Sequence, residues 1–146
     1  MSEQVSKASE HLLDKELAYK LTVDIGSGMH SHDALDKIGQ FVNPGLSQEE
    51  LKKLQIRALI GAAIITSKEQ LTDSQGRAIP RKRREDIIFI YERPLIENFK
   101  IYPEEAKRIL KMGMEGAGKE FREELRRIQK LQEVRTARKN KKVLAK

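Results

Sequence analysis

A compact run of cations near the middle of the chain has residue types that suit the binding of phosphate groups. Arg81-Lys82-Arg83-Arg84 places four positive charges in succession, and Arg77 lies four residues before the run. Cations packed this closely repel one another, so solvent, neighbouring carboxylates or an anionic partner must compensate their charge. The planar guanidinium group of arginine binds phosphate oxygens through two parallel hydrogen bonds. The run therefore predicts a contact with a nucleic-acid backbone, and the alternative is a solvated loop.

A second basic region covers the C-terminal segment from residue 119 onward. Hydrophobic residues recur there at helical spacing, and this pattern predicts a long amphipathic helix. The apolar stripe of this helix consists of Phe121, Leu125, Ile128, Leu131 and Val134. No acidic residue follows Glu133, and the candidate phosphate contacts in this tail are Arg135, Arg138, Lys139, Lys141 and Lys142. We expect the tail to bind phosphates, whereas the apolar stripe would suit a protein partner or a second copy of the chain.

Two further clusters carry groups that could do chemistry, and both have simpler explanations. His30-Ser31-His32-Asp33 could present two imidazoles and a carboxylate to a metal ion, but a catalytic zinc site takes three protein ligands and the only other histidine is His11. The segment 24–28, Asp-Ile-Gly-Ser-Gly, is reminiscent of a phosphate-binding loop, but such a loop follows a strand and the preceding residues have helical periodicity. We therefore expect solvated histidines, a flexible linker, no metal site and no cofactor.

The residue types also favour a protein that is not an enzyme. The chain has no cysteine to act as a nucleophile, a metal ligand or a disulfide partner. Its carboxylates are numerous but lie in charge-rich helical segments, and nothing in their spacing marks two of them as a matched acid and base.

The positive charge is concentrated in the second half of the chain. Residues 1–75 hold 8 Lys and Arg against 11 Asp and Glu, and residues 76–146 hold 21 against 11, so their net charges are −3 and +10. A concentrated positive field attracts polyanions over long distances. The leading hypothesis is a non-enzymatic nucleic-acid-binding protein, either a small regulator or a DNA-processing accessory factor, with DNA as the first expected partner. The rival hypothesis is a protein-interaction adaptor or homo-oligomeric scaffold that uses the C-terminal helix.

Helices must position these residues. Helical periodicity predicts helices over 6–23, 32–42, 47–65 and 103–114, in addition to the C-terminal one. Ser31 is the expected cap of the second helix, and Ser47-Gln48-Glu49-Glu50 is a capping box that starts the third. The third helix is apolar on nearly every side beyond Arg57, so we expect Leu51–Ile65 to be a buried central helix. Residues 34–65 could form a helix-turn-helix, but a second helix this apolar suits burial better than base recognition, so backbone contacts should dominate.

The apolar run Ile87–Tyr91 is compatible with two structures, a buried strand or a helical segment. The preceding Pro80 and the acidic residues 85 and 86 favour a helix start. The turn-forming residues 73–76 would instead suit a small β-hairpin near residues 64–91. We favour the helix and expect Pro94 to end it.

The expected fold is mainly all-α, with five to six helices around the central one. We divide the chain into a helical globular domain over 1–118 and a basic amphipathic helix and tail over 119–146. The N-terminus lacks the pattern of a signal peptide, and the longest apolar stretch, Ala58–Ile65, is far shorter than the roughly 20 residues that span a bilayer. We therefore expect a cytoplasmic protein with no membrane partner; in a eukaryote the run at 81–84 would suit a nuclear-import signal.

Overall fold

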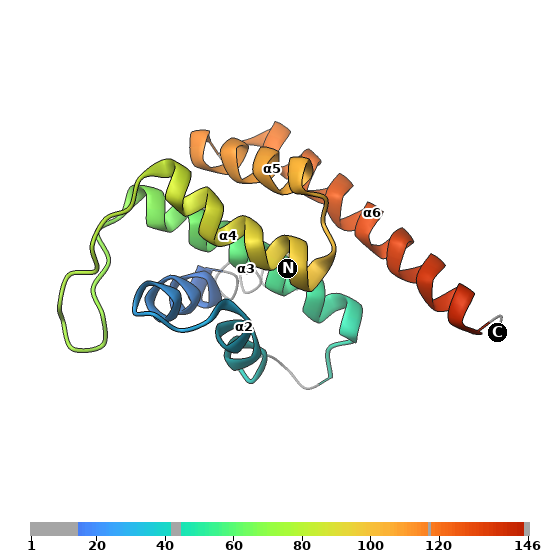
Figure 1. The fold of residues 1–146 in the computed structure, drawn as a ribbon, viewed down its shortest axis with the longest axis horizontal. Coiled ribbons are helices and arrows are strands. Elements are labelled where there is room, and N and C mark those ends of the chain that lie inside the picture. The colour runs from blue at the N-terminus through green and yellow to red at the C-terminus, as the bar shows by residue number, and fades with distance from the viewer. Residues whose placement is uncertain (1–14, 42–44, 117, 145–146) are drawn as a thin grey trace, which may run out of the picture.

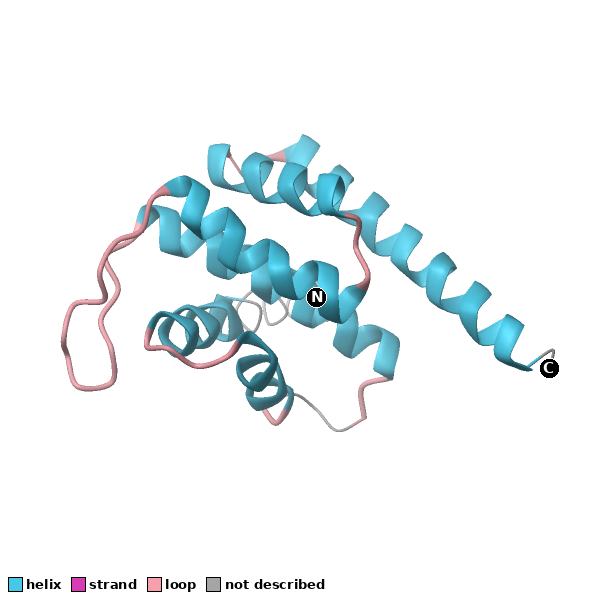
Figure 2. Cartoon of the chain, viewed as in Figure 1, coloured by secondary structure: helices cyan, strands magenta, loops and turns pink. Residues whose placement is uncertain are grey.

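The computed structural model describes residues 15–41, 45–116 and 118–144, and it describes residues 136–144 by their backbone alone. Residues 15–26 form the first described helix. It is followed by α2 (Ser31–Gly39), α3 (Gln48–Lys68), α4 (Arg84–Phe99), α5 (Pro103–Glu115) and α6 (Lys119–Leu144). Figures 1 and 2 show these helices and their connecting loops, and the described residues contain no strand. The mainly all-α fold class is confirmed.

Helix α3 begins at the predicted capping box and runs between the other helices. The Ser47 Oγ accepts a hydrogen bond from the Glu50 N–H at 3.1 Å, and the Glu50 Oε2 accepts one from the Ser47 N–H at 3.3 Å. The helix contacts α2, α4 and α5, and Leu59 and Ile60 are among its fully buried side chains. At Gly61 the first described helix approaches so closely that an added Cβ would lie 3.1 Å from the Cβ of Ala18. Small residues on α3 therefore allow close helix packing.

Residues 87–91 belong to α4, as favoured, but the prediction that Pro94 ends this helix is wrong. Helix α4 continues through Pro94 to Phe99. A proline in a helix interior removes one backbone hydrogen bond and costs about 3 kcal/mol. Pro94, Leu95 and Phe99 are all buried, and burying a leucine or phenylalanine side chain contributes about 1.5–3 kcal/mol each. Burial of this last turn therefore outweighs the lost bond, and the helix ends at Lys100 in the left-handed conformation, with φ of 58°.

In place of the alternative β-hairpin, the structure has a loop with one isolated β-bridge. Thr72 and Ala78 form an isolated antiparallel β-bridge between α3 and α4. The segments that would have formed the hairpin strands, residues 64–65 and 87–91, are both helical. We call residues 69–83 the arm, because this loop extends away from the helices at one end of the molecule (Figure 1).

Helix α6 packs on α5 at its start and extends past the other helices at its end (Figure 1). Its buried residues Phe121, Leu125 and Ile128 join the main hydrophobic core. Close packing at Gly113 of α5 supports this arrangement, since an added Cβ there would lie 3.0 Å from the Phe121 ring. The core thus includes residues on both sides of position 118, where we divided the chain. No helix in the described part of the chain is both long and apolar enough to cross a membrane.

Candidate nucleic-acid interface

The arm is an ordered structure with a narrow neck. The Ile79 N–H donates a hydrogen bond to the Leu71 carbonyl at 2.8 Å, next to the Thr72–Ala78 bridge. The side-chain amide of Gln70 donates to the carbonyls of Leu71 and Ile79 at 3.1 and 2.8 Å, so one side chain joins both segments. Leu71 and Ile79 are themselves buried. The hydrogen bonds therefore join the two segments of the neck, and the buried Leu71 and Ile79 fix the neck to the body.

The tip of the arm is a turn built around Asp73. Its Oδ1 accepts hydrogen bonds from the backbone N–H groups of Gln75 and Arg77, both at 2.9 Å. Gly76 has φ of 81°, a conformation that favours glycine. The Arg77 guanidinium lies 3.5 Å from Asp73 Oδ2 and also donates to the Gln75 side chain. The charge of Arg77 is therefore partly compensated within the turn.

Two tyrosines lie beside the first residues of the arm. The Tyr19 hydroxyl donates to both carboxylate oxygens of Glu69, at 2.6 and 2.5 Å, and this hydrogen bond raises the pKa of Tyr19. The Tyr91 hydroxyl lies 3.4 Å from the Thr66 Oγ1, and burial raises the pKa of Tyr91 to about 12. Both hydroxyls stay protonated at neutral pH, so they add no negative charge near the basic run.

The four consecutive cations at the base of the arm have different surroundings. Arg81 donates to the Ser67 carbonyl at 3.3 Å, at the C-terminal end of α3 where carbonyl groups lack helical partners. Arg84 forms an ion pair with Glu115 at 2.6 Å. Lys82 and Arg83 are exposed, and neither side chain has a hydrogen bond or ion pair within the described residues. These two side chains are therefore the ones of the basic run that have no partner within the described residues.

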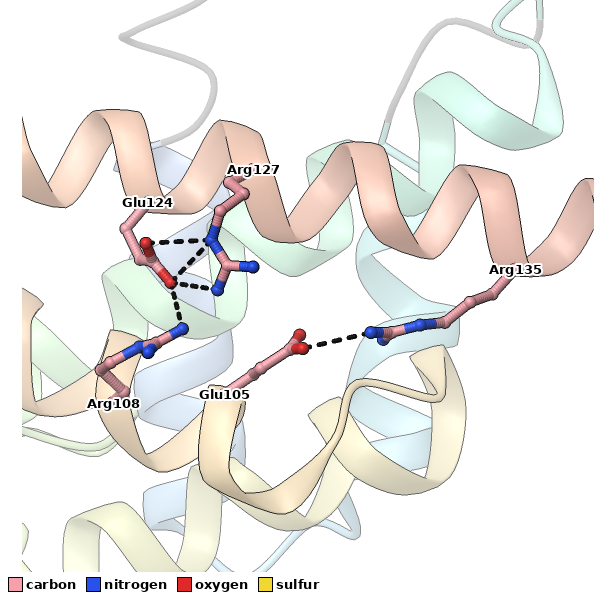
Figure 3. Close-up of polar contacts among 5 residues, drawn as sticks. All are labelled: Glu105, Arg108, Glu124, Arg127 and Arg135. Carbon is pink, nitrogen blue, oxygen red and sulfur yellow. Dashed lines mark hydrogen bonds and ion pairs between the residues drawn. The ribbon is translucent and has the colours of Figure 1, made fainter.

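The C-terminal region differs, because its first predicted cation is held inside the protein. The Arg135 guanidinium lies 3.1 Å from Glu105 Oε1 and stacks on the Tyr102 ring, 3.7 Å from the ring centroid. Figure 3 shows this ion pair joining α6 to the start of α5. Its two side chains are only 26% and 14% exposed. Arg135 therefore positions α6. Arg138, Lys139, Lys141 and Lys142 follow it on the helical backbone of α6, and their side chains lie outside the described residues.

A second polar cluster fixes the first half of α6 to α5. Glu124 accepts hydrogen bonds from Arg127 on its own helix and from Arg108 on α5, both at 2.5 Å (Figure 3). The hydrogen bond from Arg127 lowers the pKa of the Glu124 carboxyl, against an opposing effect of burial. The same contact raises the pKa of Arg127. Glu124 therefore remains charged at neutral pH and neutralises part of the positive charge on this segment.

The same helix is also tied to α3. Lys53 forms an ion pair with Glu133 at 2.5 Å, and the Gln129 amide donates to the Lys53 carbonyl at 3.2 Å. Gln129 is buried. These contacts span more than 70 residues of sequence, which explains why helical periodicity alone could not predict them.

The apolar stripe of α6 is divided between core and surface. Phe121, Leu125 and Ile128 are buried within this chain, whereas Leu131 is partly exposed and Val134 is 42% exposed. An apolar stripe on a helix has the same pattern whether it packs on its own chain or on another. Three of the five residues that were predicted to bind a partner are therefore buried within the chain itself.

The two basic regions lie at opposite ends of the molecule. Figure 1 places the arm at one end of the longest axis and the end of α6 at the other. The cations of Arg77–Arg84 and those from Arg135 onward therefore form two separate groups, and no single surface collects all the predicted phosphate contacts.

A hollow at the base of the arm adds a residue that the sequence did not single out. This hollow has a volume of about 220 Å³ and lies where α3 ends and α4 begins. Its lining comprises Ser67, Lys68, Lys82, Arg84, Ile87 and Met114. Lys68 was missed because it stands apart from the basic run; the available signal was its position in the last turn of α3, where cations are favoured.

The histidine cluster caps a helix. The His30 Nδ1 accepts a hydrogen bond from the His32 N–H at 3.1 Å, so His30 caps α2. The prediction of Ser31 as the cap is wrong by one residue: Ser31 is the first helical residue, since the imidazole reaches the free N–H. His32 lies 3.5 Å from Asp36, one turn along α2. Among the described residues, no group of three His, Cys, Asp or Glu side chains is placed to hold a metal ion.

No protein-family model, curated protein or solved structure matches the chain.

Proposed function

We propose that this is a non-enzymatic nucleic-acid-binding protein that holds the phosphate backbone, of DNA in the first instance, at two separate places. The observation that carries the proposal is the pair of exposed cations Lys82 and Arg83, which lack an anionic partner within the described residues and lie at the base of a projecting arm. Cations without intramolecular partners can neutralise phosphates and release the counterions condensed on a nucleic acid, which favours binding.

The end of α6 would supply the second contact. Residues 135–142 extend over about 12 Å of helix at 1.5 Å per residue, and a duplex carries a phosphate for about every 1.7 Å of its axis. The sequence places Arg138, Lys139, Lys141 and Lys142 on this segment and no acidic residue. A helix of this composition can lie along several phosphates. Arg135 is left out of the proposed contact set because Glu105 already binds it.

Contacts to the backbone should outweigh contacts to bases. A helix that reads the major groove must present one face to the DNA. Helix α3, the second helix of the helix-turn-helix candidate, contacts α2, α4 and α5 and buries seven of its residues. This burial supports binding with little sequence preference.

The direct test is binding of duplex DNA and of RNA by fluorescence anisotropy across a salt series. A variant carrying Lys82→Gln and Arg83→Gln removes two proposed contacts, so the slope of log K against log salt on duplex DNA should fall by about 1.8, at about 0.9 per contact. The control carries Lys107→Gln and Lys111→Gln, which remove the same charge from exposed positions of α5. Absence of binding at low salt, or a control as weak as the arm variant, would contradict the proposal.

The rival hypothesis, a protein-interaction adaptor, has less support. Of its five assigned residues, Leu131 and Val134 alone are at least partly exposed. A Val134→Lys variant would test it by sedimentation. An oligomer in the wild type that dissociates in this variant would favour the adaptor.

A further inference from the structure

We propose that the hollow at the base of the arm is a phosphate-binding site in which Lys68, Lys82 and Arg84 hold one phosphate group, and that Glu115 occupies Arg84 until the phosphate displaces it. The inference rests on the proposed function and deepens it, because it names a specific site of backbone contact. The shared chemistry is that of a phosphodiester in a nucleic acid or of a free phosphate ion, and the experiment separates these two sources.

Three cations reach the hollow from two parts of the chain, the end of α3 and the basic run. Lys68 belongs to the last turn of α3, Lys82 to the base of the arm, and Arg84 to the first turn of α4. The tertiary structure therefore brings Lys68 to two cations of the basic run. The volume of about 220 Å³ far exceeds the roughly 10–15 Å³ required for a single water molecule, so the hollow has room for a phosphate group.

The rest of the lining strengthens the attraction for an anion. Ile87 and Met114 supply apolar surface, and charges interact more strongly beside apolar surface than in bulk water. The start of α4 contributes as well, because its cap, Arg83, makes no side-chain hydrogen bond to the first-turn N–H groups. Glu85 and Asp86 of the same turn are exposed and do not line the hollow.

Glu115 is the competing anion at this site. Its carboxylate lies 2.6 Å from the Arg84 guanidinium, and the two side chains are 64% and 49% exposed. An ion pair this exposed is weak, because water and salt screen it. Glu115 is also the last residue of α5, where the helix dipole disfavours a carboxylate. A phosphate, which accepts two parallel hydrogen bonds from an arginine, can therefore replace the carboxylate on Arg84.

The test is a titration of the full chain with inorganic phosphate at low, constant ionic strength, followed by NMR of the backbone amides. We expect the signals of residues 67–68 and 82–87 to shift. Lys68→Gln should weaken phosphate binding by roughly threefold or more, and Glu115→Gln should strengthen it by roughly threefold, the range expected for loss of one exposed ion pair. Lys107→Gln is the matched control, because it removes the same charge from an exposed position that does not line the hollow. Urea unfolding of each variant verifies that the fold is retained.

The outcomes separate this inference from the proposed function. Equal phosphate affinity in the Lys68→Gln and Lys107→Gln variants, or weaker binding by Glu115→Gln, would overturn the phosphate site. If duplex DNA still bound with a salt slope in that case, the proposed function would stand. If phosphate bound as expected but neither DNA nor RNA bound at low salt, the site would stand as one for free phosphate and the proposed function would fail.

Discussion

The base of the arm and the start of the C-terminal tail are both rich in arginine, but their ion pairs differ in how far they are exposed to solvent. Arg84 and Arg135 each pair with a glutamate of α5, about 30 residues away in sequence, Glu115 in the first case and Glu105 in the second. The Arg84 pair is roughly half exposed, whereas the Arg135 pair is largely buried and also stacks on an aromatic ring. An arginine whose ion pair is exposed can thus exchange its carboxylate for the anion of a partner. An arginine whose ion pair is buried cannot.

The largest effect should come from the core-facing half of α6. Ile128 is fully buried, so Ile128→Ala should lower the free energy of unfolding by about 2–5 kcal/mol through lost burial and the cavity left behind. Val134→Ala, on the exposed side, should change it by less than about 0.5 kcal/mol. Urea unfolding followed by circular dichroism measures both. Similar values for the two variants would show that α6 does not dock as described.

The two glutamates of α5 provide the most direct test of the comparison. Glu105→Gln leaves the Arg135 charge largely buried without its carboxylate, so it should cost about 1–3 kcal/mol of stability. Glu115→Gln removes an exposed pair and should cost at most about 0.5 kcal/mol. Both variants make the same chemical change on one helix, so each controls for the other. A larger loss in Glu115→Gln than in Glu105→Gln would reverse the assignment of structural and available cations.

Acid should weaken the contact between α5 and α6. The pKa of Glu124 is lowered in the folded protein, chiefly by its hydrogen bond from Arg127, so its stabilising contribution is present above the carboxyl pKa of the unfolded chain. That contribution is lost as the pH falls through the lower folded pKa. Because the group is partly solvated, the loss should be at most about 1 kcal/mol. Urea unfolding from pH 6 to pH 3 should show a shallower decline for Glu124→Gln than for wild type; parallel curves would exclude the effect.

The smallest expected change distinguishes two arginines in DNA binding. Arg83→Gln should reduce the salt slope on duplex DNA by about 0.9, whereas Arg135→Gln should leave it nearly unchanged, because Glu105 already compensates that charge. The measurement is the anisotropy salt series with each single variant. An equal decrease for both would mean that phosphate competes successfully for Arg135 and that burial does not decide availability.

Local signals in the sequence were sufficient for several elements of the fold. The Ser47 capping box and the proline at the first position of α5 both start helices where predicted, because a cap is determined by residues within one turn of it. The prediction that Pro94 ends α4 is wrong, because it considered only the local effect of a proline. Burial of Leu95 and Phe99 against other helices stabilises the turn that follows the proline. Burial by a distant helix has no signature in neighbouring residues.

The candidate interface was harder to predict for the same reason. The basic run identified Lys82 and Arg83, but it also included Arg84, which Glu115 binds from another helix. The apolar pattern of α6 did not indicate which part of the stripe would meet α5. The positions of the two basic regions, at opposite ends of the molecule, follow from the packing of all the helices (Figure 1).

The narrow neck of the arm also makes its tip a suitable attachment point for a spectroscopic probe. The chain contains no cysteine, so Ser74→Cys would create a single thiol, at an exposed position of the turn around Asp73. The Gln70 amide and the paired backbone at residues 71 and 79 separate that position from the helices, so a fluorophore there should leave their packing undisturbed. Such a label would report the approach of a binding partner to the arm without altering any of the cations at its base.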